Sequence, residues 1–129
     1  MIESIDIDRL INDKAFRAAF LEKSVRESIS RQIKELREWK DWTQAELAQR
    51  LNTRASAIAR LENPRSKNAP RIATLLAIAA VFDVALMVRF ESWSKFLLIV
   101  PEKILWLGSE EELRRLREWS EQRGDNPAG

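Results

Sequence analysis

Residues 42–63 have the sequence WTQAELAQRLNTRASAIARLEN. Thr43 stands three residues before Glu46, a capping-box spacing in which the hydroxyl and the carboxylate each satisfy a free backbone N–H at the start of a helix. This spacing predicts a helix over Gln44–Leu51, and the apolar residues that follow predict a second short helix over Ala55–Glu62. Two short helices joined by a turn of three residues cross at a large angle, so the sequence predicts a helix-turn-helix unit.

The residues on either side of this unit predict further helices. Between residues 13 and 39, apolar side chains recur at steps of three and four, which predicts one or two amphipathic helices. On the other side, Pro70 suits the first turn of a helix, where its missing N–H costs nothing. That helix is predicted over Arg71–Phe82. Because apolar residues cover three of its sides, it is the predicted centre of the core.

Apolar residues alternate with others from Val84 to Phe90, a pattern typical of a short β-strand. The backbone groups of a strand must be paired, and the sequence leaves two partners open: Phe96–Val100 of the same chain, or the same strand of a second copy. Further on, Ser109 precedes a predicted C-terminal helix over Glu110–Gln122 with another capping-box spacing. The predicted fold class is therefore mainly α, with a short β-strand and a C-terminal helix that offer a surface for dimerisation.

The composition excludes several classes of chemistry. The chain has 129 residues but no Cys and no His, so it cannot build Cys/His metal sites, disulfide scaffolds or Ser-His-Asp and Cys-His nucleophile systems. We therefore expect no enzyme, no cofactor and no metal. The longest apolar run, Leu75–Phe82, is far shorter than the ~20 residues of a bilayer span, and the first residues carry acids instead of the basic region of a signal peptide. We expect a cytoplasmic protein with no membrane contact.

The formal net charge of +2 is unevenly distributed along the chain. Residues 28–71 hold ten bases and five acids, whereas residues 1–27 hold five bases and six acids and residues 72–129 hold seven bases and nine acids. An excess of positive charge confined to one third of the chain is typical of a surface that binds phosphate. A merely solvated basic face is the alternative.

The residues between Gln32 and Phe82 resemble a known family, and the likeness covers roughly residues 28–85, about half of the chain. Residues 42–63, preceded by IKELREWK and followed by PRIATLLAIAAVFDV, are similar to the phage Cro/repressor type of helix-turn-helix DNA-binding domain, known in bacteria as the Xre type. The most diagnostic pieces are Thr43–Gln44, Glu46–Leu47–Ala48, Ile58 and Arg60–Leu61–Glu62–Asn63. The resemblance implies a lambda-repressor-like helical domain over residues 28–85. It leaves residues 1–27 as an N-terminal tail and helix, and residues 86–129 as a strand-and-helix extension for dimerisation or partner binding.

The resemblance also implies how the chain meets DNA. The helix over Ala55–Glu62 would enter the major groove, and the positions that match base-contacting ones are Ala55, Ser56 and Arg60. A guanidinium at Arg60 suits guanine O6 and N7 together. The positions that match DNA-backbone contacts are Gln44, Arg54, Asn63, Arg65, Lys67 and Arg71. Two alternatives stay open: Arg60 pairs with Glu62 or with an acid of the first helix, and the basic loop after the unit is only solvated surface.

The sequence departs from the family pattern at three places. Arg54 and Ala55 stand where family members commonly have Ser or Thr followed by Gln, which removes a good N-cap worth ~1 kcal/mol and an amide suited to adenine. Asn52 replaces a glycine of the turn, and Asn accepts a left-handed backbone better than most residues. Pro64 replaces a glycine after Asn63. These departures affect base specificity more than binding itself.

The predicted function is that of a sequence-specific DNA-binding transcriptional regulator, a homodimeric repressor on double-stranded DNA. Operators for such modules hold two half-sites, so the chain needs a dimer surface. The alternating residues Val84, Leu86, Val88 and Phe90 are the predicted interface. The alternative is an antitoxin-like subunit that binds and neutralises a toxin-like protein partner and autoregulates its operon. The C-terminal extension would then serve as the docking surface.

Overall fold

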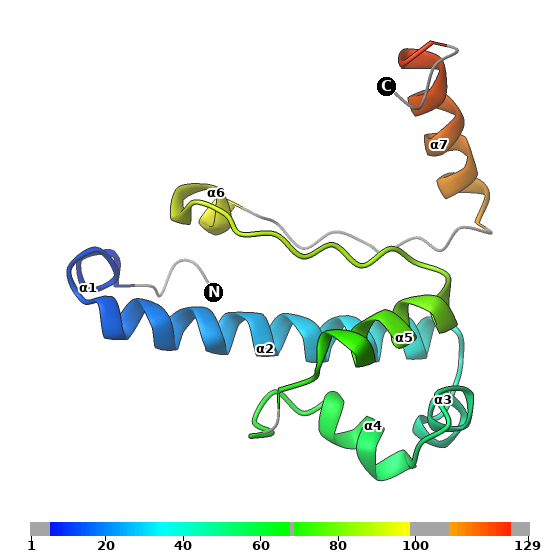
Figure 1. Ribbon diagram of the computed structural model, residues 1–129, viewed down its shortest axis with the longest axis horizontal. Helices are drawn as coiled ribbons and strands as arrows, with labels where there is room; N and C mark the ends of the chain where they lie inside the picture. The colour runs from blue at the N-terminus through cyan, green and yellow to red at the C-terminus, as the bar shows by residue number, and fades with distance from the viewer. Residues whose placement is uncertain (1–5, 68, 99–108, 125–129) are drawn as a thin grey trace.

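The computed structural model describes residues 6–67, 69–98 and 109–124 (Figure 1). In chain order their helices are α1 (Ile7–Asn12), α2 (Lys14–Trp39), α3 (Gln44–Arg50), α4 (Ala55–Leu61), α5 (Ile72–Phe82), α6 (Trp93–Leu98) and α7 (Glu110–Gln122). The 26-residue α2 is a single helix across the whole span where one or two were predicted. As Figure 1 shows, α3, α4 and α5 gather at its C-terminal half, while α1 and α6 lie at its N-terminal half.

One hydrophobic core joins α2, α3, α4 and α5. Its most deeply buried side chains are Leu47 of α3, Ile58 of α4 and Phe82 of α5, and Ile33 and Leu36 of α2 close it from the other side. Burial of each large apolar side chain contributes about 1.5–3 kcal/mol. The helix after Pro70 contributes Ile78 and its last residue, Phe82, to this core, whereas Ile72 and Leu76 of the same helix are exposed, so its apolar residues are not buried on all three sides.

The helix-turn-helix unit forms through the local interactions that its sequence predicts. Thr43 Oγ1 accepts from the backbone N–H of Glu46 at 3.1 Å, and Glu46 Oε1 accepts from the N–H of Thr43 at 3.4 Å, so the capping box is present. Asn52 adopts the left-handed backbone of the turn, with φ 55°. α4 begins after Arg54 with no side-chain cap, the loss that the absence of Ser or Thr there predicts.

The predicted β-strand at Val84–Phe90 is wrong, because the described part of the chain contains no strand. α5 ends at Asp83 in a left-handed cap, φ 55°, and the chain then runs extended back along α2 towards α6 (Figure 1). The proposed partner Phe96–Val100 is not a strand either: its first three residues belong to α6, and residues 99 and 100 lie outside the described residues. Without a paired neighbour, an alternating pattern cannot make a ladder.

A second, aromatic cluster holds α6 against the N-terminal half of α2. The ring of Trp93 lies 6.1 Å from that of Phe20 and 5.5 Å from that of Phe96, and Phe20 stacks on Phe16 at 6.4 Å. Arg9 of α1 places its guanidinium 4.5 Å from the centre of the Phe16 ring. Such pairs contribute about 0.5–1.5 kcal/mol each beyond the area they bury. Residues before and after the helix-turn-helix unit thus pack on each other.

The C-terminal helix is confirmed over Glu110–Gln122, and Ser109 Oγ accepts from the N–H of Glu112 at 3.2 Å. None of the residues of α7 is buried, although Leu113, Leu116 and Trp119 form an apolar stripe. In Figure 1 this helix stands apart from the others. None of the helices in the described ranges has both the length and the apolar character that a membrane span needs.

Candidate nucleic-acid interface

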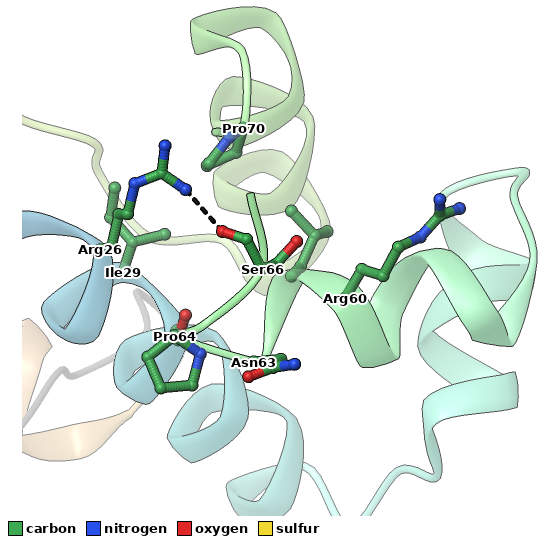
Figure 2. A pocket seen from close by; sticks show the side chains of 9 residues that line it. Arg26, Ile29, Arg60, Asn63, Pro64, Ser66 and Pro70 are labelled. Carbon is green, nitrogen blue, oxygen red and sulfur yellow. Dashed lines mark hydrogen bonds between the residues drawn. The ribbon is translucent and has the colours of Figure 1, made fainter. Parts of the chain in front are cut away.

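The outer face of α4 is open to solvent. Ala55 and Ser56 are exposed in its first turn, and Arg60 is exposed one turn further on, while Ile58 points into the core. Residues four apart in a helix lie on one face, so Ser56 and Arg60 are neighbours. Helix geometry therefore brings Ser56 and Arg60 onto one accessible face, and Ala55 is exposed in the same first turn as Ser56. In Figure 2 the Arg60 side chain extends away from the cluster around Arg26.

Positive charge around this face has no carboxylate partner in the part of the chain that the structure describes. Of the ion pairs formed within the described residues, none includes the side chains of Arg54, Arg60, Arg65, Lys67 and Arg71. The two acids between residues 43 and 71 are both engaged elsewhere, Glu46 in the capping box and Glu62 in an ion pair. Cations that are not neutralised inside the protein are free to neutralise phosphate.

Glu62 at the end of α4 pairs with Arg37 of α2 in a nearly buried, two-pronged contact. Arg37 Nε donates to Glu62 Oε2 at 2.6 Å and Nη2 donates to Oε1 at 2.9 Å, while Nη1 donates to the carbonyl oxygen of Trp42 at 2.8 Å. The hydrogen bond to the Glu62 carboxylate raises the pKa of Arg37 above its usual value. The alternative pairing of Arg60 with Glu62 is not formed, and none of the ion pairs among the described residues includes Arg60.

Gln44, a predicted backbone contact at the start of α3, is tied to the same ion pair. Its Nε2 donates to Glu62 Oε1 at 3.3 Å, and its side chain is half-buried. An amide nitrogen carries two protons, so one remains for another acceptor. Glu62 therefore connects α2, α3 and α4 and orients the Gln44 amide.

The loop after α4 carries the next predicted backbone contacts on a defined turn. The N–H of Ser66 donates to the carbonyl oxygen of Asn63 at 3.1 Å, and the N–H of Arg65 donates to Asn63 Oδ1 at 3.0 Å. Asn followed by Pro64 is a favoured start for a β-turn, because Pro sets the φ that the second position needs. Arg65 and Lys67 are exposed, as is Arg71 at the N-cap of α5.

These elements coincide with a known domain family. Residues 33–87 match the family described as helix-turn-helix. The chain carries a helix-turn-helix domain of the Cro/repressor (Xre) type. Comparison with curated proteins and with solved structures found no match. Members of the Xre family are DNA-binding regulators and not typically enzymes, and this protein is a helix-turn-helix DNA-binding regulator.

The residues predicted for the dimer interface lie on the extended segment that follows α5. Val84 is half-buried and packs against the core, whereas Leu86, Val88 and Phe90 are exposed on the extended segment. Met87, one of the residues that alternate with these four, is 76% exposed. This segment therefore presents apolar side chains in both directions and not on one side only.

A small hollow lies between α2 and the loop after α4 in the Xre domain. It is lined by Arg26, Ile29, Asn63 and Pro64, among others, and is shown in Figure 2. Its volume of about 10 Å³ suffices for roughly one water molecule. This hollow is too small for an organic effector.

Sequence reasoning missed the two arginines of α2 that hold the Xre domain together, Arg37 and Arg26. Arg37 follows the buried Ile33 by four residues, and a charged residue at the edge of an apolar stripe is a signal that a partner lies opposite. Arg26 donates to the backbone of the loop after α4. A side chain that binds carbonyl oxygens far along the chain leaves no signal in local spacing.

Proposed function

We propose that this regulator is a dimeric, sequence-specific repressor in which α4 occupies the major groove of its operator. The observation that carries the proposal is the exposed α4 face, bounded by cations that have no carboxylate partner within the described residues. In this role Ala55, Ser56 and Arg60 face base edges. Arg60 would contribute about 1–3 kcal/mol of discrimination if it contacts a guanine with two hydrogen bonds.

The remaining contacts supply affinity without sequence choice. The proposed phosphate-contacting side chains come from the first turn of α3, the start of α4 and the loop up to α5: Gln44, Arg54, Asn63, Arg65, Lys67 and Arg71. Each phosphate that a cation neutralises releases counterions, so affinity falls steeply as salt rises. The proposal includes no catalysis, cofactor or metal, and it places the protein in the cytoplasm, on the chromosome.

Selection of random duplexes by the full chain tests this function. We expect enrichment of a two-fold symmetric site at about 100 mM salt, where nonspecific phosphate binding is already weakened. Arg60→Ala should then weaken the selected site by about 1–3 kcal/mol and leave random DNA unchanged. Lys67→Ala should weaken both equally and lower the salt slope by about one. Failure to enrich any sequence would contradict a specific repressor.

A single introduced cysteine tests the dimer. The protein has no Cys, so Val88→Cys is the sole thiol of the variant. If the exposed side chains of Leu86, Val88 and Phe90 pack against a second copy, mild oxidation should trap a disulfide dimer at micromolar protein. Ala18→Cys, on the exposed side of α2, is the matched control. Equal cross-linking of the two variants, or a monomer by light scattering, would contradict this interface.

The unburied face of α7 favours a second candidate function, an antitoxin-like subunit. Leu113, Leu116 and Trp119 form a stripe that no described residue covers fully, and Trp119 is 46% exposed. A partner protein would bury this stripe. Affinity purification from the source cell should recover a stoichiometric partner with the full chain and lose it with Leu116→Asp. Recovery of no partner would count against this candidate.

A further inference from the structure

Arg26 of α2 binds the backbone of the loop that follows α4. Its Nη1 donates to the carbonyl oxygen of Ser66 at 2.6 Å, the contact drawn in Figure 2, and its Nη2 donates to that of Lys67 at 3.4 Å. Glu22, one turn earlier, accepts from the same guanidinium at 3.1–3.2 Å. Arg26 precedes the matched residues 33–87, so the contact comes from outside the family domain.

The loop so held is the one that carries Arg65 and Lys67. Its start is fixed by the Asn63–Ser66 turn, and its far end is fixed by Arg26. We propose that Arg26 is a positioning residue for DNA binding: by fixing the carbonyl oxygens of Ser66 and Lys67, it presents Arg65 and Lys67 to the phosphate backbone. This inference rests on the proposed DNA binding and names a residue that acts through others.

The chemistry of the contact suits this role. A guanidinium is a planar fork that can donate to two carbonyl oxygens at once, and hydrogen bonds from a charged donor are stronger than neutral ones. A loop that is ordered before binding loses less conformational freedom when DNA arrives, so more of the phosphate attraction appears as affinity. The charge of Arg26 itself is compensated by Glu22, and its side chain is mostly covered. Both features argue against Arg26 as a direct phosphate ligand.

The first test examines the loop without DNA. In the full chain, hydrogen exchange of the Ser66 and Arg65 amides should accelerate severalfold in Arg26→Ala, because the turn then closes without its anchor. Arg31→Ala is the matched control: it removes an arginine of the same helix whose pairing, with Glu35 at 3.2 Å, is local and exposed. The Ile33 amide in the core of α2 reports whether the variant stays folded. Unchanged loop exchange in a folded Arg26→Ala would overturn the inference.

The second test uses a mixed-sequence duplex of roughly 30 base pairs, long enough for two half-sites. Arg26→Ala should bind it about tenfold more weakly, with a salt slope lower by about 1–2, the share of two phosphate contacts. In a background of Arg65→Ala with Lys67→Ala, Arg26→Ala should have little further effect, because the side chains it positions are gone. Arg31→Ala should bind the duplex with the same affinity and the same salt slope as the unaltered chain.

The outcomes separate the inference from the function on which it rests. If the unaltered chain fails to bind duplex DNA, the proposed function is wrong and the positioning role is wrong with it. If the unaltered chain binds and Arg26→Ala binds equally well, only the positioning role is overturned. Equal losses from Arg26→Ala in both backgrounds would also overturn it, because additive effects indicate a direct phosphate contact.

Discussion

Removal of the Glu62 carboxylate should destabilise the domain more than any surface substitution. Glu62 is 5% exposed and its partner Arg37 is 13% exposed, so neither charge can turn to water when the other is lost. In Glu62→Met the Arg37 guanidinium keeps, among the described residues, one hydrogen-bond acceptor, the carbonyl oxygen of Trp42 at 2.8 Å. Leaving one partner of a buried ion pair uncompensated costs about 3–5 kcal/mol. With a urea slope of about 2 kcal/mol/M, the unfolding midpoint should fall by about 2 M.

Chemical denaturation followed by helical circular dichroism measures this effect in four chains: the unaltered one, Glu62→Met, Arg37→Met and the double variant. Two methionines fill similar volume without charge, and such replacements are often neutral. We therefore expect the double variant to be at least about 2 kcal/mol more stable than the sum of the single losses implies. Arg31→Ala, which breaks an exposed pair, should cost only about 0.3–0.5 kcal/mol. Additive single losses, or losses under about 1 kcal/mol, would refute the reasoning.

Arg54→Ser should supply the side-chain cap that α4 lacks and raise the free energy of unfolding by about 1 kcal/mol, while the loss of a cation lowers the salt slope of DNA binding by about one. Arg54→Ala should lower the salt slope of DNA binding equally but should not raise the free energy of unfolding. Equal stability of the two variants would contradict the N-cap position of residue 54. Stability should also be flat from about pH 6 to about pH 8, because the chain has no His to titrate there. The Glu62 hydrogen bond raises the pKa of Arg37, so this contribution is present at neutral pH and is lost only as pH rises past the folded pKa, far above this range. Urea titrations at the two pH values measure this. A difference above about 1 kcal/mol in the free energy of unfolding would show that another group titrates in this range.

The parts of the fold that the sequence predicts correctly depend on contacts within three or four residues. Thr43 with Glu46, and Ser109 with Glu112, are such contacts, and α3 and α7 begin where these pairs place them. Asn52 is likewise a local case, since its tolerance of positive φ is a property of the residue itself. Local signals of this kind survive in the folded chain because no distant contact competes with them.

The strand prediction failed because a strand is defined by its neighbour. Alternation from Val84 to Phe90 describes side chains only, and the segment that was to pair with it begins inside α6. A short apolar run such as Phe96–Val100 suits a helix or a strand equally. The helix is favoured by the contact of Trp93 in α6, whose ring lies 6.1 Å from that of Phe20 in α2. Sequence patterns do not contain contacts between residues so far apart.

The same limit applies to the candidate interface. The exposure of Ser56 and Arg60 follows from helix periodicity, which the sequence shows. The bonds that orient the rest of the surface join residues 25 apart, for Arg37 and Glu62, and 40 apart, for Arg26 and Ser66. Their identification required the fold, because many arginines have carboxylates at helical spacing, and among the arginines that the structure describes only Arg26 and Arg37 donate hydrogen bonds to residues 25 or more positions away.

The long helix α2 carries both arginines, Arg26 and Arg37, on one side. Arg26 and Arg37 lie eleven residues apart, which is about three turns, so they emerge from the same side of the helix about 16 Å from each other. Ile29 and Ile33 lie between them and pack on the core, so one face of α2 has an apolar middle and a guanidinium near each end. One guanidinium fixes the end of α4 through Glu62, and the other fixes the loop beyond it through Ser66. A chain beginning at residue 28 would keep the core and the Arg37 pair but lose the anchor of the loop, so its fold would survive better than its affinity for phosphate.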